Sequence, residues 1–145
     1  FEPVMDLHPE LFFFTPLIAA MAGNVGVQSS AIIVQGLANN TIIGPVVERL
    51  LKELSLSLLN GVILSVILLA GSYFLLGYEI HVGYTVSIAL LSVIIMASLI
   101  GTFIPIILNK YGVDPALATC PFITTSNDIL GILTSFTITK IILGI

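Results

Sequence analysis

Long apolar runs separated by short polar segments dominate the pattern along this chain. Residues 54–77 and 82–109 carry no charged residue, and each run exceeds the roughly 20 residues that a transmembrane helix needs. A third span is expected over about residues 11–38, before the breaking segment ANNTIIGP. A fourth is expected over about residues 116–142, where Asp114 can cap a helix with Pro115 at its first position. The pattern therefore predicts an all-α, polytopic membrane helix bundle with four visible helices.

Composition supports an integral membrane protein. The 145 residues are 57% hydrophobic and 8% charged, whereas soluble domains carry about 25% charged residues. This length fits one transmembrane domain over residues 1–145. The absence of period-two alternation argues against a barrel, and a single cysteine, Cys120, argues against a disulfide framework or cysteine metal cluster. Nothing in the sequence resembles a basic nucleic-acid surface.

The few basic residues predict the orientation of the spans. Arg49 and Lys52 lie in the first connection and Lys110 in the third, while the second connection, GYEIHVG, has no lysine or arginine. The positive-inside rule then makes the first and third connections cytoplasmic and the C-terminus external. The segment IIGPVVERLLKELSL is expected to be a short amphipathic piece, with Glu48 and Glu53 lying beside the two basic residues at the cytoplasmic surface.

A narrow polar stripe runs along the first expected helix. At about 100° per residue, Asn24, Gln28 and Gln35 fall on one side of a helix over residues 11–38. Such polar side chains are costly where lipid surrounds them. Small residues accompany the stripe, namely Ala20, Gly23, Gly26, Ala31 and Ala38.

A similar stripe occupies the fourth expected helix, within PFITTSNDILGILTSFTITK. The second and third spans carry only scattered serine, glycine and threonine, so they are expected to face lipid or to pack. Two of the four helices therefore have a hydrophilic face. The stripe of the fourth helix comprises Thr124, Asp128, Ser135 and Thr139, with Pro121 at its head and Gly131 beside it.

Helix packing is an alternative explanation for part of these stripes. Small residues let helices approach closely, and an interhelical hydrogen bond from Asn or Gln contributes about 0.6–2 kcal/mol. Gly23, Gly26 and Gly131 fit packing better than ion binding, whereas for Asn24 and Gln28 both explanations stay open. Serine and threonine hydroxyls can bond to their own helix backbone, so those of the fourth helix carry little weight singly.

Asp128 is harder to explain by packing. A carboxylate at the centre of a membrane helix costs about 2.5–3.5 kcal/mol on insertion scales, and intramembrane ionisable residues mark ion or proton pathways. The basic residues lie near helix ends, and Lys140 is twelve positions further along the same helix, roughly 18 Å away. We therefore expect Asp128 either to be protonated or to face water and cations.

One carboxylate among amides and hydroxyls indicates a site for a hard cation. Such oxygen ligands suit Mg²⁺ and Ca²⁺, whereas softer metals prefer thiolate or imidazole. Mg²⁺ gives up its water reluctantly, so these groups are expected to bind the water shell while Asp128 attracts the charge. If two copies met on a two-fold axis, two Asp128 carboxylates would share one path, and their titrations would be coupled.

The segments MAGNVGVQSSAIIVQGLA and, about ninety residues later, DPALATCPFITTSNDILG resemble the membrane domain of the MgtE family of magnesium channels. The resemblance covers essentially the whole chain, and the two motifs at this spacing are far more specific than either alone. The initial FEP resembles the external end of that family's first membrane helix. On this view the chain shows the second to fifth of five membrane helices.

The resemblance implies a homodimer whose pore runs along the two-fold axis, lined by the two helices that carry polar stripes here. The family's acidic residue that matches Asp128 binds hydrated Mg²⁺ at the cytoplasmic side of the pore, and the residue that matches Asn24 faces the ion path. The expected ion-binding residues are Asp128, Asn24, Gly23, Gln28, Thr124 and Thr125, and the expected pore-lining residues are Gln35, Ala20, Ala31, Pro121, Gly131 and Ser135.

The resemblance also implies partners and a location. Family members carry cytoplasmic regulatory and CBS domains that sense magnesium and close the pore, and these would be partners in a full-length protein. Membrane lipid is the other expected partner, and nucleic acid is not expected. The implied location is the bacterial inner membrane with an external C-terminus.

The leading function is a Mg²⁺-selective channel or transporter, with Mn²⁺, Co²⁺ and Ca²⁺ as alternative ions for the same site. A proton- or cation-coupled divalent metal exchanger is the alternative within transport. An intramembrane aspartyl hydrolase would need two carboxylates, and each chain supplies one within the bilayer, so no enzymatic activity is expected. A purely structural subunit would not explain why the chain places the Asp128 carboxylate in the membrane at a cost in free energy.

Overall fold

Four long α-helices account for most of the chain in the computed structural model, which describes residues 9–41, 45–118 and 121–144. They are α2 (Glu10–Ala38), α3 (Val46–Phe74), α4 (Ile80–Lys110) and α5 (Pro121–Leu143), with a short 3-10 helix, η1 (Pro115–Ala118), before the last. Each long helix is long and apolar enough to cross a membrane. The predicted all-α membrane bundle is therefore confirmed, while the FEP segment and Cys120 lie outside the described residues.

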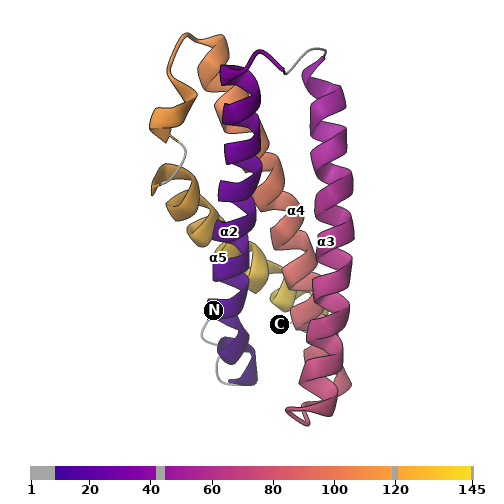
Figure 1. Cartoon of the computed structure of the whole chain (residues 1–145). Coiled ribbons are helices and arrows are strands. Elements are labelled where there is room, and N and C mark those ends of the chain that lie inside the picture. The colour runs from indigo at the N-terminus through magenta and orange to yellow at the C-terminus, as the bar shows by residue number, and fades with distance from the viewer. Residues whose placement is uncertain (1–8, 42–44, 119–120, 145) are drawn as a thin grey trace.

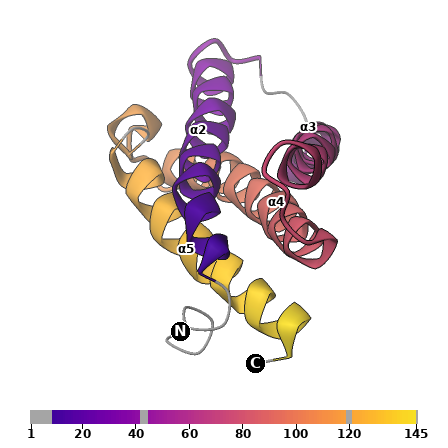
Figure 2. The same ribbon diagram turned by 90° about the horizontal axis from the view of Figure 1, so that it is seen from below.

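Helix α4 is the centre of the bundle and contacts α2, α3 and α5. Figure 1 shows α4 running between α2 and α3, with α5 crossing α2 obliquely. Seen from below, α3 stands on the side of α4 away from α5 (Figure 2). One face of the bundle therefore belongs to α2 and α5, which are the two helices with polar stripes.

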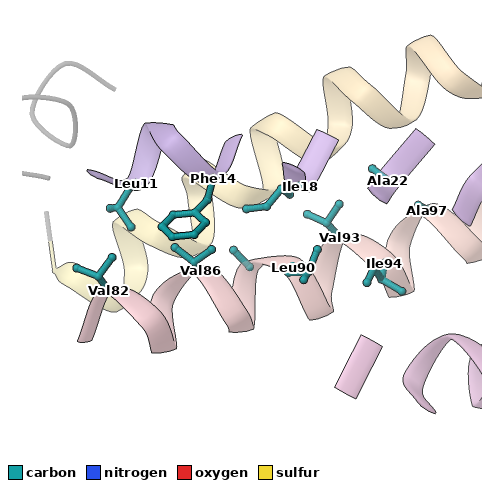
Figure 3. Packing of buried hydrophobic residues seen from close by; sticks show 11 residues of the cluster. Leu11, Phe14, Ile18, Ala22, Val82, Val86, Leu90, Val93, Ile94 and Ala97 are labelled. Carbon is teal, nitrogen blue, oxygen red and sulfur yellow. The ribbon is translucent and has the colours of Figure 1, made fainter. Parts of the chain in front are cut away.

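The interior is built mainly between α2 and α4. Apolar residues spaced three and four positions apart form one stripe on each helix, which is the spacing that places side chains on one helical face. Within lipid these stripes associate through close packing of side chains more than through exclusion of water. Figure 3 shows Leu11, Phe14, Ile18 and Ala22 of α2 meeting Val82, Val86, Leu90, Val93, Ile94 and Ala97 of α4.

Helix α3 begins earlier than its apolar run. The amphipathic segment is continuous with the second span, because the helix starts at Val46 directly after the extended Pro45. Ion pairs four residues apart, Lys52–Glu48 at 3.0 Å and Arg49–Glu53 at 3.5 Å, support this first part of the helix.

The prediction that all four charges of this segment lie at a surface is wrong for one of them. The side chains of Lys52 and Glu48 are 64% and 60% exposed, whereas Glu53 is only 5% exposed. Its position, one turn further into α3, brings it between helices, and it lines a cavity there together with residues of α2.

The connection between α4 and α5 also differs from expectation. Asp114 acts as a cap, because its Oδ1 accepts a hydrogen bond of 2.9 Å from the backbone N–H of Ala116. The capped element is the 3-10 helix η1, and the long helix begins at Pro121 rather than near residue 116. Proline is favoured at the first position of a helix and disfavours helical backbone at the residue before it, so Pro121 marks the boundary.

Candidate functional site

The two polar stripes meet in a groove between α2 and α5. The groove has a volume of about 380 Å³. It brings together five of the six expected ion-binding residues, and the sixth, Thr125, is exposed outside its lining. The groove is lined by Ala20, Gly23, Asn24, Val27, Gln28, Ala31, Thr124 and Asp128.

The spacing along each helix explains this lining. The α2 lining residues recur every three or four positions from Ala20 to Ala31, as adjacent pairs on one helical face, and Thr124 and Asp128 of α5 are separated by one turn. Thr125 follows Thr124 by one residue, so it points about 100° away around α5. The helical period thus explains why Thr124 lines the groove and the chemically identical Thr125 does not.

Gly23 allows α5 to approach the backbone of α2 at the groove. A Cβ atom at position 23 would lie 3.0 Å from Oδ1 of Asp128 and 3.5 Å from Cγ2 of Thr124. The first distance is closer than ordinary van der Waals contact, so the carboxylate rests directly against the glycine. Gly23 therefore sets the width of the groove at the level of Asp128.

The Asp128 carboxylate has no basic partner. Among the described residues it takes part in no hydrogen bond or ion pair, and Arg49 and Lys52 are paired with glutamates of their own helix. Asp128 is partly exposed and lines the groove. An unpaired carboxylate facing a polar groove is stabilised by water or by a cation.

A tight seam of small residues lies behind the groove. A Cβ at Gly26 would collide with the amide of Asn127, and one at Gly101 would collide with the carbonyl of Gly26. At Gly131, a Cβ would lie 3.0 Å from Cβ of Ala22. These three glycines hold α2, α4 and α5 together, as expected for small residues at membrane helix interfaces.

The structure brings only two of the six expected pore-lining residues into the groove. Gln35 is exposed nearer the C-terminal end of α2, and Pro121 is exposed at the start of α5. Gly131 and Ser135 are buried, and the close approach of Ala22 to Gly131 supports the packing explanation for that glycine. Ala20 and Ala31 do line the groove.

Asn127 is a residue at this site that the sequence analysis missed. It is fully buried, and neither its Nδ2 nor its Oδ1 has a hydrogen-bond partner among the described residues. Its side chain packs against Gly26, directly beside the position of Asp128. The feature of the sequence that could have identified Asn127 is its position directly before Asp128. When Asp128 faces the groove, the preceding residue on the helix faces the seam of small residues.

The donor set of the groove suits a hydrated hard cation. A carboxylate, two amides and a hydroxyl offer oxygen atoms, the ligands that Mg²⁺ and Ca²⁺ prefer. In the described part of the chain, no three His, Cys, Asp or Glu residues gather at one place. A single chain therefore offers binding through the water shell more readily than a closed cage of direct ligands.

Comparisons with known proteins show which family the chain is similar to. The profile of the MgtE family, described as a divalent cation transporter, matches residues 15–138. The magnesium transporter MgtE of Bacillus subtilis is 37% identical over 94% of this chain, and that of Thermus thermophilus is 32% identical over 99%. The magnesium transporter MgtE of Enterococcus faecalis is 34% identical over 95% of the chain.

The match is confined to one part of these relatives. The chain spans 30%, 32% and 30% of their respective lengths. The family profile nevertheless covers most of the chain, including the groove residues of both α2 and α5. The chain belongs to the MgtE family of divalent cation transporters.

Proposed function

We propose that this chain forms the ion-conducting part of a Mg²⁺ channel and that the groove between α2 and α5 is one wall of its pore. The observation that carries the proposal is the unpaired Asp128 carboxylate, which faces a polar groove on an otherwise apolar membrane bundle. Relatives named as magnesium transporters support Mg²⁺ as the ion. Asp128 attracts the charge, and Asn24, Gln28 and Thr124 bind the water shell.

The pore is completed by a second copy of the chain on a two-fold axis. One chain supplies a single carboxylate in an open groove, and a two-fold axis beside the α2–α5 face would bring two Asp128 residues to one path. Helix α3 stands on the other side of α4 (Figure 2), and many of its large apolar residues are exposed. That arrangement leaves α3 to contact lipid while the polar face forms the dimer.

The orientation and regulation of the pore follow from the same proposal. The basic residues Arg49, Lys52 and Lys110 lie on the cytoplasmic side of a bacterial inner membrane, and the C-terminus is external. Cytoplasmic regulatory domains of the full-length protein gate the pore, in keeping with relatives of which this chain spans only about a third.

Uptake of Mg²⁺ into proteoliposomes tests the transport activity. The chain is reconstituted with a fluorescent Mg²⁺ indicator inside the vesicles, and a Mg²⁺ gradient is imposed with and without a protonophore. A channel gives uptake above protein-free vesicles that the protonophore leaves unchanged. Uptake that requires a proton gradient would instead support the coupled exchanger, and uptake no greater than that of protein-free vesicles would contradict transport by this chain.

A further inference from the structure

A second polar cavity lies inside the bundle, apart from the groove. It lies between α2, α3 and α4, is partly open to the surface, and has a volume of about 190 Å³. Polar residues from both α2 and α3 face it. We call it the Glu53 cavity, and it is lined by Val25, Gln28, Ser29, Ile32, Glu53, Leu56, Ser57, Asn60 and Ile94.

Glu53 is a buried carboxylate with one charged partner among the described residues. It is 5% exposed, and its Oε1 lies 3.5 Å from Nη2 of Arg49. Charge-assisted hydrogen bonds are shorter, about 2.7–2.9 Å, so this ion pair is loose. A carboxylate has about four acceptor positions on its two oxygens, and this single loose ion pair leaves most of them free.

The other polar groups in the Glu53 cavity can also accept. Neither Gln28 nor Asn60 makes a hydrogen bond to any described residue. The hydroxyl of Ser57 donates to the backbone carbonyl of Glu53 at 2.6 Å, and that of Ser29 donates to Oγ of Ser98 at 3.3 Å. With their protons committed, both hydroxyl oxygens keep acceptor capacity, so the cavity offers one carboxylate together with the amide and hydroxyl oxygens.

The cavity adjoins both the groove and the protein surface. Gln28 lines the groove as well as the Glu53 cavity. On the other side, Ile32, Glu53 and Leu56 line both the cavity and a surface hollow that also includes Arg49 and Lys52. Three hollows therefore lie in series from Asp128 to the start of α3.

We propose that the Glu53 cavity is a second site for a hydrated divalent cation, beside the Asp128 groove. Oxygen groups around one carboxylate are the ligands that hard cations prefer. Arg49 lines the surface hollow, so its guanidinium approaches Glu53 from the outer side and competes with the cation for the carboxylate. With one carboxylate and this competition, the dissociation constant is expected near the weak end for protein sites, about 10⁻³ M.

Binding of Mn²⁺ to the solubilised protein tests this site independently of transport. Free Mn²⁺ is measured by electron paramagnetic resonance, with Mg²⁺ as competitor, in a protein carrying Asp128→Asn to remove the groove site. One further Mn²⁺ per chain is expected to bind and to be displaced by Mg²⁺. Adding Glu53→Gln abolishes this binding, whereas Glu48→Gln, an equal charge change on the same helix at an exposed position, leaves it unchanged.

Arg49→Gln separates a cation site from a merely structural ion pair. Removing the competing guanidinium tightens Mn²⁺ binding by about tenfold, the scale on which one neighbouring charge shifts proton affinity. A structural pair predicts no gain in affinity. Asn60→Leu keeps the Arg49–Glu53 pair and places an apolar residue at an exposed position. It is expected to weaken Mn²⁺ binding, so it tests the site even if the Glu53→Gln protein fails to fold.

Two results would overturn the proposal. One is that the Asp128→Asn protein binds no Mn²⁺ at millimolar concentration. The other is that Glu53→Gln, or Asn60→Leu where the former does not fold, binds Mn²⁺ as its parent does. Neither result depends on uptake, so failure of the Glu53 site and failure of the proposed channel are distinguishable.

Discussion

The contact between Gly23 and Asp128 is where a single methyl group has the largest expected effect on the groove. Gly23→Ala places Cβ 3.0 Å from Oδ1 of Asp128, so the carboxylate must shift by a few tenths of an ångström. We expect Mg²⁺ uptake to fall several-fold while the protein stays folded, because alanine favours the helix over glycine by about 1 kcal/mol. Uptake by reconstituted protein, with helicity checked by circular dichroism, measures this effect.

Gly71→Ala is the matched control for this prediction. Gly71 lies in α3, and a Cβ there meets nothing within 4 Å. The same substitution should therefore leave uptake unchanged. If Gly71→Ala and Gly23→Ala behave alike, the contact with Asp128 does not control conduction.

At the scale of helices, the crossing of α2 and α4 at Gly26 and Gly101 should be the most sensitive to added volume. A Cβ at position 101 would strike the carbonyl of Gly26, and backbone cannot move aside as a flexible side chain can. Overpacking of this kind costs about 1–3 kcal/mol. Gly101→Ala should lower the midpoint temperature of thermal unfolding in detergent, and Gly71→Ala should not. Equal midpoints for the two variants would show that this helix crossing does not limit the stability of the protein.

The sequence predicted the helices well because apolar length and period are local properties. The four spans, the stripe containing Asn24 and Gln28, and the singular position of Asp128 all follow from spacing along one helix. The boundaries were harder to predict: α3 continues through its charged first turns, and η1 precedes α5. Both depend on capping and proline geometry over a few residues, which hydrophobicity does not report.

The burial of Glu53 could not be predicted from α3 alone. On its own helix it belongs to a charged, amphipathic segment, and only the packing of α2 and α4 beside α3 encloses it. Likewise, Gly131 and Ser135 share a helix with Asp128, but the oblique crossing of α5 directs them to the interior. The direction of a side chain relative to other helices is a tertiary property, so it decides which stripe residues reach the groove.

At the scale of the whole molecule, the proposed dimer predicts which face of the bundle meets a second copy. In a protein carrying Cys120→Ser, a cysteine at Ala31 in the groove should be joined to its counterpart by a short bismaleimide. Leu59→Cys, on α3 and at a position 60% exposed, should remain monomeric because it faces lipid. Gel electrophoresis after cross-linking in membranes shows which of the two proteins forms a covalent dimer. Preferential cross-linking at position 59 would place the dimer interface on α3 and contradict the proposed α2–α5 interface.

The central claim is that the Asp128 carboxylate is the ion site of the pore. The most direct measurement compares Mg²⁺ uptake by Asp128→Asn and by Asp114→Asn, which make the same chemical change. Asp114 is exposed and caps η1 outside the groove, and asparagine caps equally well. We predict that Asp128→Asn abolishes uptake and that Asp114→Asn retains it; native uptake by the Asp128→Asn protein would contradict a role for Asp128 as the ion site.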